Sequence, residues 1–171
     1  MKRLISYTIL ASLVFIGYLL ANTLAGVLAA NALPVAQESL HQQKIYAYRD
    51  WQSVGIQIHE DEMVDIQASG EWLYTPGEYH GPEGHPRYPA PDFYPIAGAP
   101  GGILIGKIGE TGMPFIVGQG TSVSAYEWQA REGIQNSGLL YLRINDDILS
   151  DNKGSVVVAF TVTKADDEYR E

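Results

Sequence analysis

The densest group of potential ligand atoms in this 171-residue chain lies near its C-terminal end. Between Asn145 and Asn152, six of eight residues carry a side-chain oxygen, and three of these are aspartates. Carboxylates this close repel one another unless a cation lies among them, and Ca²⁺ takes about 6–8 such oxygen ligands. The segment therefore predicts a calcium site, although Val157 stands where an EF-hand has its bidentate Glu. A solvated hairpin turn is the alternative, because Asn, Asp, Ser and Gly are ordinary turn residues.

A second stretch with chemical potential runs from Tyr74 to Tyr94 and contains five aromatic residues among glycines and prolines. Exposed rings suit sugar binding, because a ring covers the apolar face of a pyranose while polar groups such as His80 or His85 bind its hydroxyls. A loop that packs on itself and caps the domain is the alternative. Two histidines alone are too few for a zinc site.

The composition argues against several other functions. A formal net charge of −9, from 11 Lys and Arg against 20 Asp and Glu, argues against nucleic-acid binding. The absence of Cys removes disulfides and thiol catalysis. Gly101–Ile108 nearly matches a phosphate-binding loop, but Ile108 replaces the required hydroxyl residue and the interior is typical of a strand. No nucleophile or zinc-protease motif is present, so we do not expect an enzyme.

The elements that position these segments are predicted to be short β-strands. Apolar and β-branched runs bounded by turn residues cover Val54–Ile58, Val64–Ala68, Ile103–Ile108, Pro114–Val117, Val123–Gln129, Leu139–Ile144 and Ser155–Thr163. Trp72 and Tyr74 extend the second strand beyond Gly70, where a bulge is expected. These strands, without an amphipathic helix, predict an all-β, two-sheet antiparallel sandwich over residues 45–164. A linker over residues 33–44 and a charged tail over residues 165–171 are expected to flank it.

The N-terminal segment is long and apolar enough to cross a membrane. Leu4–Ala30 carries no charge and follows Lys2 and Arg3. Such a helix is about 40 Å long, which exceeds the hydrocarbon thickness of about 30 Å. Residues 1–32 are therefore predicted to form a transmembrane anchor with a cytoplasmic N-terminus. A cleaved signal peptide is the alternative, because Ala30–Ala32 matches the small-residue pattern of a cleavage site.

Small residues at helical spacing give this predicted helix a smooth face. Ala21, Ala25 and Ala29 repeat every fourth residue, a pattern that lets another transmembrane helix approach closely. Other transmembrane helices of a membrane complex are therefore possible partners. The β-domain would lie on the outer side of the membrane in either arrangement.

Four blocks of this sequence, in the same order, resemble the bacterial calcium-dependent galactophilic lectins of the PA-I type. The resemblance covers about residues 50–163, and its blocks are Val64–Tyr74, Gly81–Gly84, Gly102–Gly109, and Leu140–Asp146 with Asp151–Ser155. It implies a jelly-roll β-sandwich of the galactose-binding-domain-like class, in which one calcium bridges the protein and two sugar hydroxyls. Because the family is bacterial, the predicted anchor is expected in a bacterial inner membrane, with a periplasmic or extracytoplasmic β-domain, although the membrane helix itself departs from these soluble lectins.

The resemblance also implies which residues bind. Tyr74 would give calcium a backbone carbonyl, Asp146, Asp151 and Asn152 side-chain oxygens, and Ser150 or Leu149 a further carbonyl. Asp146 and Asp151 would also bind sugar hydroxyls, with a backbone contact from Asp147. His85 matches the start of the family's His-Pro-Asp-Gln galactose loop, but Arg87 and Tyr88 then depart from it, so galactose itself is not supported.

Two functions follow from these observations. The first is a membrane-anchored, exported, calcium-dependent carbohydrate-binding module. The second is a non-catalytic structural or accessory subunit of a larger membrane complex, which braces its partners through the helix and the β-sandwich. Sugar binding predicts an open calcium position beside exposed aromatic rings, whereas bracing predicts that other chains cover them.

Overall fold

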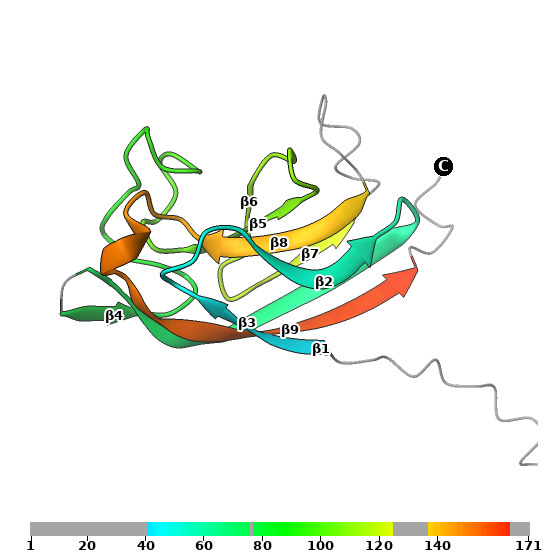
Figure 1. Cartoon of the computed structure of the whole chain (residues 1–171), viewed down its shortest axis with the longest axis horizontal. Helices are drawn as coiled ribbons and strands as arrows, with labels where there is room; N and C mark the ends of the chain where they lie inside the picture. The colour runs from blue at the N-terminus through cyan, green and yellow to red at the C-terminus, as the bar shows by residue number, and fades with distance from the viewer. Residues whose placement is uncertain (1–40, 76, 125–136, 165–171) are drawn as a thin grey trace, which may run out of the picture. The chain divides into compact units, whose positions relative to one another are not determined.

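A computed structural model describes residues 41–75, 77–124 and 137–164, which form two antiparallel β-sheets (Figure 1). The first sheet has the strand order β1-β9-β3-β4, and β7 also pairs with β3. Its strands are β1 (His41–Tyr46), β3 (Glu62–Thr75), β4 (Glu78–His80), β7 (Gly120–Ser124) and β9 (Lys153–Lys164). The second sheet has the order β2-β8-β5-β6. Its strands are β2 (Gln52–Ile58), β5 (Leu104–Ile108), β6 (Phe115–Ile116) and β8 (Gly138–Ile144).

The core forms between the two sheets from the apolar residues that alternate along their strands. Val64, Ile66 and Trp72 of β3 are fully buried, and Phe160 of β9 is 1% exposed. They pack in one cluster with buried residues of the second sheet, including Leu142. Side chains two residues apart point to the same face of a strand, so these patterns bury one face of each sheet. The predicted all-β, antiparallel two-sheet architecture is confirmed.

Strand β3 organises the molecule because it is long enough to pair with three other strands. Along one edge it pairs with β9 without a break, from Glu62↔Lys164 to Leu73↔Lys153. Along the other edge it pairs with β7 at one end and β4 at the other. The bulge expected at Gly70 is absent from the β3–β9 ladder, and the register shifts instead between Leu73 and Thr75, against β4.

The boundary of the domain also differs from the expected one. β1 begins at His41, so the last four residues of the expected linker over 33–44 pair with β9. These residues are mostly exposed and polar, because β1 lies at the edge of its sheet, and the apolar alternation that marks a strand is therefore weak. Of the strand expected at Val123–Gln129, Val123 and Ser124 lie in β7, and residues 125–129 lie outside the described residues.

The predicted transmembrane segment, residues 1–32, and the tail, residues 165–171, lie outside the described residues. Among the residues that are described, none belongs to a helix with the length and apolar character needed to span a membrane. The one helical turn in the described part between β8 and β9 is the 3-10 turn η1 (Leu149–Asp151). It lies at the same end of the sandwich as β4 and the long loop between β4 and β5 (Figure 1).

Candidate functional site

The pairing of β3 with β9 brings Tyr74 next to the acidic segment. The last pair in the ladder is Leu73↔Lys153, so one further step along each strand sets Tyr74 opposite Asn152. Tyr74 also lies where the β3–β4 register shifts. A bulge of this kind leaves the backbone of one residue outside the ladder. Two parts of the predicted site, far apart in the sequence, thus meet at one end of the sandwich.

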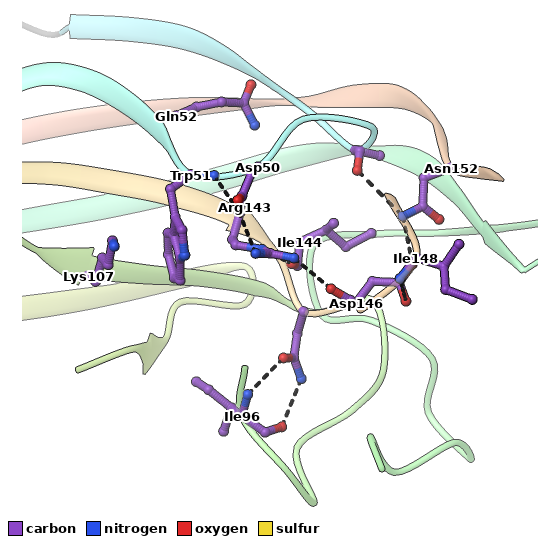
Figure 2. Close-up of polar contacts among 12 residues, drawn as sticks. Asp50, Trp51, Gln52, Ile96, Lys107, Arg143, Ile144, Asp146, Ile148 and Asn152 are labelled. Atoms are coloured by element: carbon purple, nitrogen blue, oxygen red, sulfur yellow. Dashed lines mark hydrogen bonds and ion pairs between the residues drawn. The ribbon is translucent and has the colours of Figure 1, made fainter. Parts of the chain in front are cut away.

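Asp146 and Asn152 form the buried centre of the site. Asn152 Nδ2 donates to Asp146 Oδ2 at 2.7 Å and lies 3.5 Å from the Ala47 carbonyl oxygen, while the Ile148 amide donates to Asp146 Oδ1 at 3.3 Å (Figure 2). The two residues are only 3% and 2% exposed. Asn152 Oδ1 is buried without a hydrogen-bond partner among the described residues. A buried polar atom in this state is rare and indicates a missing partner.

Arg143 fixes a positive charge behind the acidic segment (Figure 2). Its Nη1 pairs with Asp50 Oδ1 at 2.5 Å, and its Nη2 donates to the backbone carbonyl of Asp146 at 2.6 Å. Burial lowers the pKa of Arg143, while the charges of Asp50, Asp146 and Asp147 act in the opposite direction. Arg143 therefore binds the backbone of Asp146, whereas the Asp146 carboxylate accepts hydrogen bonds from neutral donors.

Two tyrosine hydroxyls lie beside Asp146. The hydroxyls of Tyr74 and Tyr94 are 3.2 Å apart. Burial raises the pKa of Tyr94, and its contacts with Tyr74 and the Asp146 carboxylate add to the rise. Burial also raises the pKa of Tyr74, and the charges of Asp146 and Asp151 add to it. The phenols thus stay protonated and are available as hydrogen-bond donors near the site.

The Tyr94 segment is held in place by an asparagine clamp (Figure 2). The fully buried Asn145 accepts a hydrogen bond from the Ile96 amide and donates one to the Ile96 carbonyl, both at 3.0 Å. Gly102 donates to the Asn145 carbonyl at 2.9 Å, and Trp72 Nε1 donates to the Gly102 carbonyl at 3.0 Å. A Cβ on Gly102 would lie 2.6 Å from the Tyr74 ring, so the loop approaches Tyr74 as only glycine allows.

His85, predicted to contact sugar, belongs to an adjoining aromatic group. The centroid of its ring lies 6.1 Å from the centroid of the Tyr88 ring, and the Tyr88 centroid lies 6.3 Å from that of the Tyr74 ring. An open pocket of about 260 Å³ lies beside it. The lining residues are His85, Pro86, Arg87, Tyr88, Pro89, Gly98 and Pro100. Tyr79, Tyr88 and Phe93, on the same stretch, are 57%, 45% and 68% exposed.

The remaining predicted residues lie on the exposed side of the acidic segment. Asp147 is exposed immediately after the buried Asp146, and Ser150 and Asp151 are exposed on η1. Sequence reasoning missed Asn145 as a clamp, Tyr94 as a neighbour of Asp146, and Glu78. The signal available for Asn145 in the sequence was its position at the end of a strand, where it has no function in a turn. Glu78 and His80 stand two residues apart, a spacing that puts both on one face of a strand.

The donor groups fit a calcium ion. Asp146 supplies a buried carboxylate and Asn152 a buried amide oxygen that lacks a partner. Ser150 and Asp151 directly precede Asn152 on η1, the backbone at Tyr74 lies opposite Asn152, and calcium accepts such mixed sets of hard oxygen atoms in flexible geometry.

The fold is similar to that of a solved lectin domain. The structure is similar to a solved structure described as the EclA N-terminal domain, a PllA-like lectin, with a TM-score of 0.51 and 20% sequence identity. The match covers 72% of this chain and 98% of that chain. No protein-family model and no curated protein matches the sequence. The described residues therefore form a lectin-like antiparallel β-sandwich.

Proposed function

We propose that this chain is a calcium-dependent carbohydrate-binding module, exported and held at the bacterial inner membrane by residues 1–32. The observation that carries the proposal is the buried pair Asp146 and Asn152, with an amide oxygen that lacks a partner, in a sandwich that shares the fold of a lectin domain. The proposed export and membrane anchoring rest on the sequence of residues 1–32 alone.

Calcium would be bound by the Tyr74 carbonyl, Asp146, Ser150, Asp151 and Asn152. The carboxylate of Asp146 is buried and accepts hydrogen bonds from neutral donors, and a bound cation would lower the cost of burying its charge. The charge of Arg143 attracts this carboxylate, but Arg143 donates to the Asp146 carbonyl oxygen and not to the carboxylate. When bound, calcium would supply open coordination positions for sugar hydroxyls.

The sugar would contact the exposed rim of this site. Asp146 and Asp151 would accept hydrogen bonds from hydroxyls, with a backbone contact from Asp147. The aromatic group extends from Tyr74 through Tyr88 to His85 and the open pocket. That pocket is smaller than the roughly 300–1,000 Å³ of sites that enclose a drug-sized ligand, and its size suits one sugar ring that stays partly exposed.

A glycan array probed with the labelled full chain tests this proposal. We expect binding to a set of glycans in calcium and loss of that binding in excess chelator. Asp146→Asn should bind none of these glycans in calcium. Asp147→Asn is the matched control, because its side chain is exposed and its predicted contact is through the backbone. Glycan binding that persists in chelator, or that survives Asp146→Asn, contradicts the proposal.

A further inference from the structure

A second group of ligand atoms lies outside the acidic segment, on β4 and the turn that follows it. Glu78 and His80 occupy alternate positions of β4 and so project to the same face. The turn Gly81–Gly84 is closed by a hydrogen bond from the Gly84 amide to the Gly81 carbonyl. The backbone amide of His85 then donates to the Gly101 carbonyl. One ligand atom from each of Glu78, His80 and His85 lies within 4.8 Å of the others.

The distances within this group match a metal site better than a hydrogen-bonded one. The Nε2 atoms of His80 and His85 lie 3.4 and 3.5 Å from the same oxygen, Glu78 Oε2. Hydrogen bonds between nitrogen and oxygen are usually about 2.7–3.2 Å long. Ligand atoms at about 2.0–2.1 Å from a tetrahedral zinc ion are about 3.3–3.4 Å apart. The three side chains are therefore spaced as two edges of a zinc tetrahedron that share the Glu78 oxygen.

The two histidines differ in how their nitrogens are satisfied. His80 Nε2 is buried and has no hydrogen-bond partner among the described residues, although its side chain is 14% exposed. His85 Nδ1 accepts a hydrogen bond from the Arg87 amide at 3.2 Å. In the metal-free chain the proton of His85 is therefore on Nε2, towards Glu78.

We propose that Glu78, His80 and His85 bind one divalent transition-metal ion, with Zn²⁺ as the ion that best fits two imidazoles and a carboxylate. Zinc displaces the proton of His85 from Nε2 to Nδ1, and the Arg87 amide then loses its acceptor. The side chain of Glu78 is 60% exposed, so solvent reaches the site, and three protein ligands leave the fourth position of the ion for water. The site shares no ligand with the proposed calcium site, so either metal site survives failure of the other, although His85 also belongs to the aromatic group proposed to contact sugar.

Zinc titration of the full chain, prepared without a polyhistidine tag, tests this site. We expect one zinc ion per chain by calorimetry, with affinity unaffected by millimolar calcium. His85→Gln and His80→Gln should abolish binding, and Glu78→Gln should weaken it by at least about tenfold, the loss typical of even indirect ligand partners. His59→Gln is the matched control, because His59 is exposed in the β2–β3 turn. Misfolding would not explain a loss of zinc affinity in Glu78→Gln, because the side chain of Glu78 is exposed.

Nitrogen-15 NMR of the histidine rings gives an independent result on the same samples. We expect the His85 ring to carry its proton on Nε2 without metal and on Nδ1 with zinc, together with a shift of the Arg87 amide resonance. Failure of the native chain to bind zinc overturns the proposal. So does zinc affinity that is unchanged in both histidine variants, or zinc that calcium displaces, because the ion would then lie elsewhere.

Discussion

Asn152 donates a hydrogen bond from Nδ2 to Asp146 Oδ2 at 2.7 Å, while Oδ1 of the same amide is buried without a hydrogen-bond partner among the described residues. A carboxylate accepts hydrogen bonds and donates none, so an amide next to it turns its NH₂ group towards it. In this orientation Oδ1 is free to act as a ligand atom, and a cation bound there would supply the partner that this buried oxygen lacks.

Asn152→Asp should make the stability of the domain depend strongly on calcium. The variant replaces the donor with a second carboxylate beside Asp146, and both residues are buried. We expect the free energy of unfolding to fall by about 2–4 kcal/mol in chelator, because two unpaired charges are then buried together. Calcium should recover most of this loss. Urea unfolding in calcium and in chelator measures both values, and equal losses under the two conditions would contradict a cation at this position.

Asn145→Ala should destabilise the domain and weaken glycan binding together. The variant removes both hydrogen bonds to Ile96 and leaves that amide and carbonyl without their partner. We expect a loss of about 1–3 kcal/mol in the free energy of unfolding. The Tyr94 segment is then no longer fixed beside Asp146. Gln42→Ala is the control, because Gln42 is exposed on β1 and should change neither quantity.

Gly84→Ala should cost more stability than an alanine at another glycine of similar backbone conformation. Gly84 has φ +77°, and a Cβ there would lie 2.5 Å from the Ile103 amide nitrogen. Gly77 has φ +82°, but a Cβ there meets nothing within 4 Å. In both variants the alanine must adopt a left-handed backbone conformation, which costs about 1 kcal/mol of stability. Urea unfolding should show a further loss of about 1–3 kcal/mol for Gly84→Ala alone, from the clash with backbone. Equal losses in the two variants would contradict this packing.

The domain should lose stability in alkali above the ordinary pKa of tyrosine. Burial raises the pKa of Tyr74 and of Tyr94 in the folded chain. The tyrosine pKa is about 10 in the unfolded chain and higher in the folded chain. The resulting contribution to stability is complete below about pH 10 and is lost as the pH rises further. Urea unfolding from about pH 8 to 11 should show the decline, and Tyr94→Phe should make it shallower. Tyr79→Phe, at an exposed ring, should leave it unchanged; an equal decline in all three chains would contradict the assignment.

The sequence predicts those parts of the fold that depend on local alternation. Val64, Ile66 and Trp72 stand at alternate positions and are buried, and the last strand behaves in the same way. β1 and β4 have no such pattern, because one lies at a sheet edge and the other has only three residues, none of them buried. Local pattern therefore finds strands that carry an apolar run, including the edge strands β2 and β6, and misses those that do not.

The candidate site is predictable only in part, because it depends on contacts between distant segments. Asp146 and Asn152 lie within one short segment that composition alone indicates, and the resemblance to a known family singles out these two residues. The position of Tyr74 opposite Asn152 requires the β3–β9 register, and the clamp between Asn145 and Ile96 joins residues 49 positions apart. A single sequence contains no signal for either pairing beyond the resemblance to a known family.

Calcium titration of the full chain by calorimetry tests whether the acidic segment binds the ion. We expect one calcium ion bound per chain, with binding abolished in Asp146→Asn. Asp61→Asn is the matched control, because this half-exposed aspartate lies in the acidic turn before β3, at the opposite end of that strand from Tyr74, and should leave calcium binding unchanged. No heat of binding at millimolar calcium, or equal binding by the native chain and Asp146→Asn, would contradict the account.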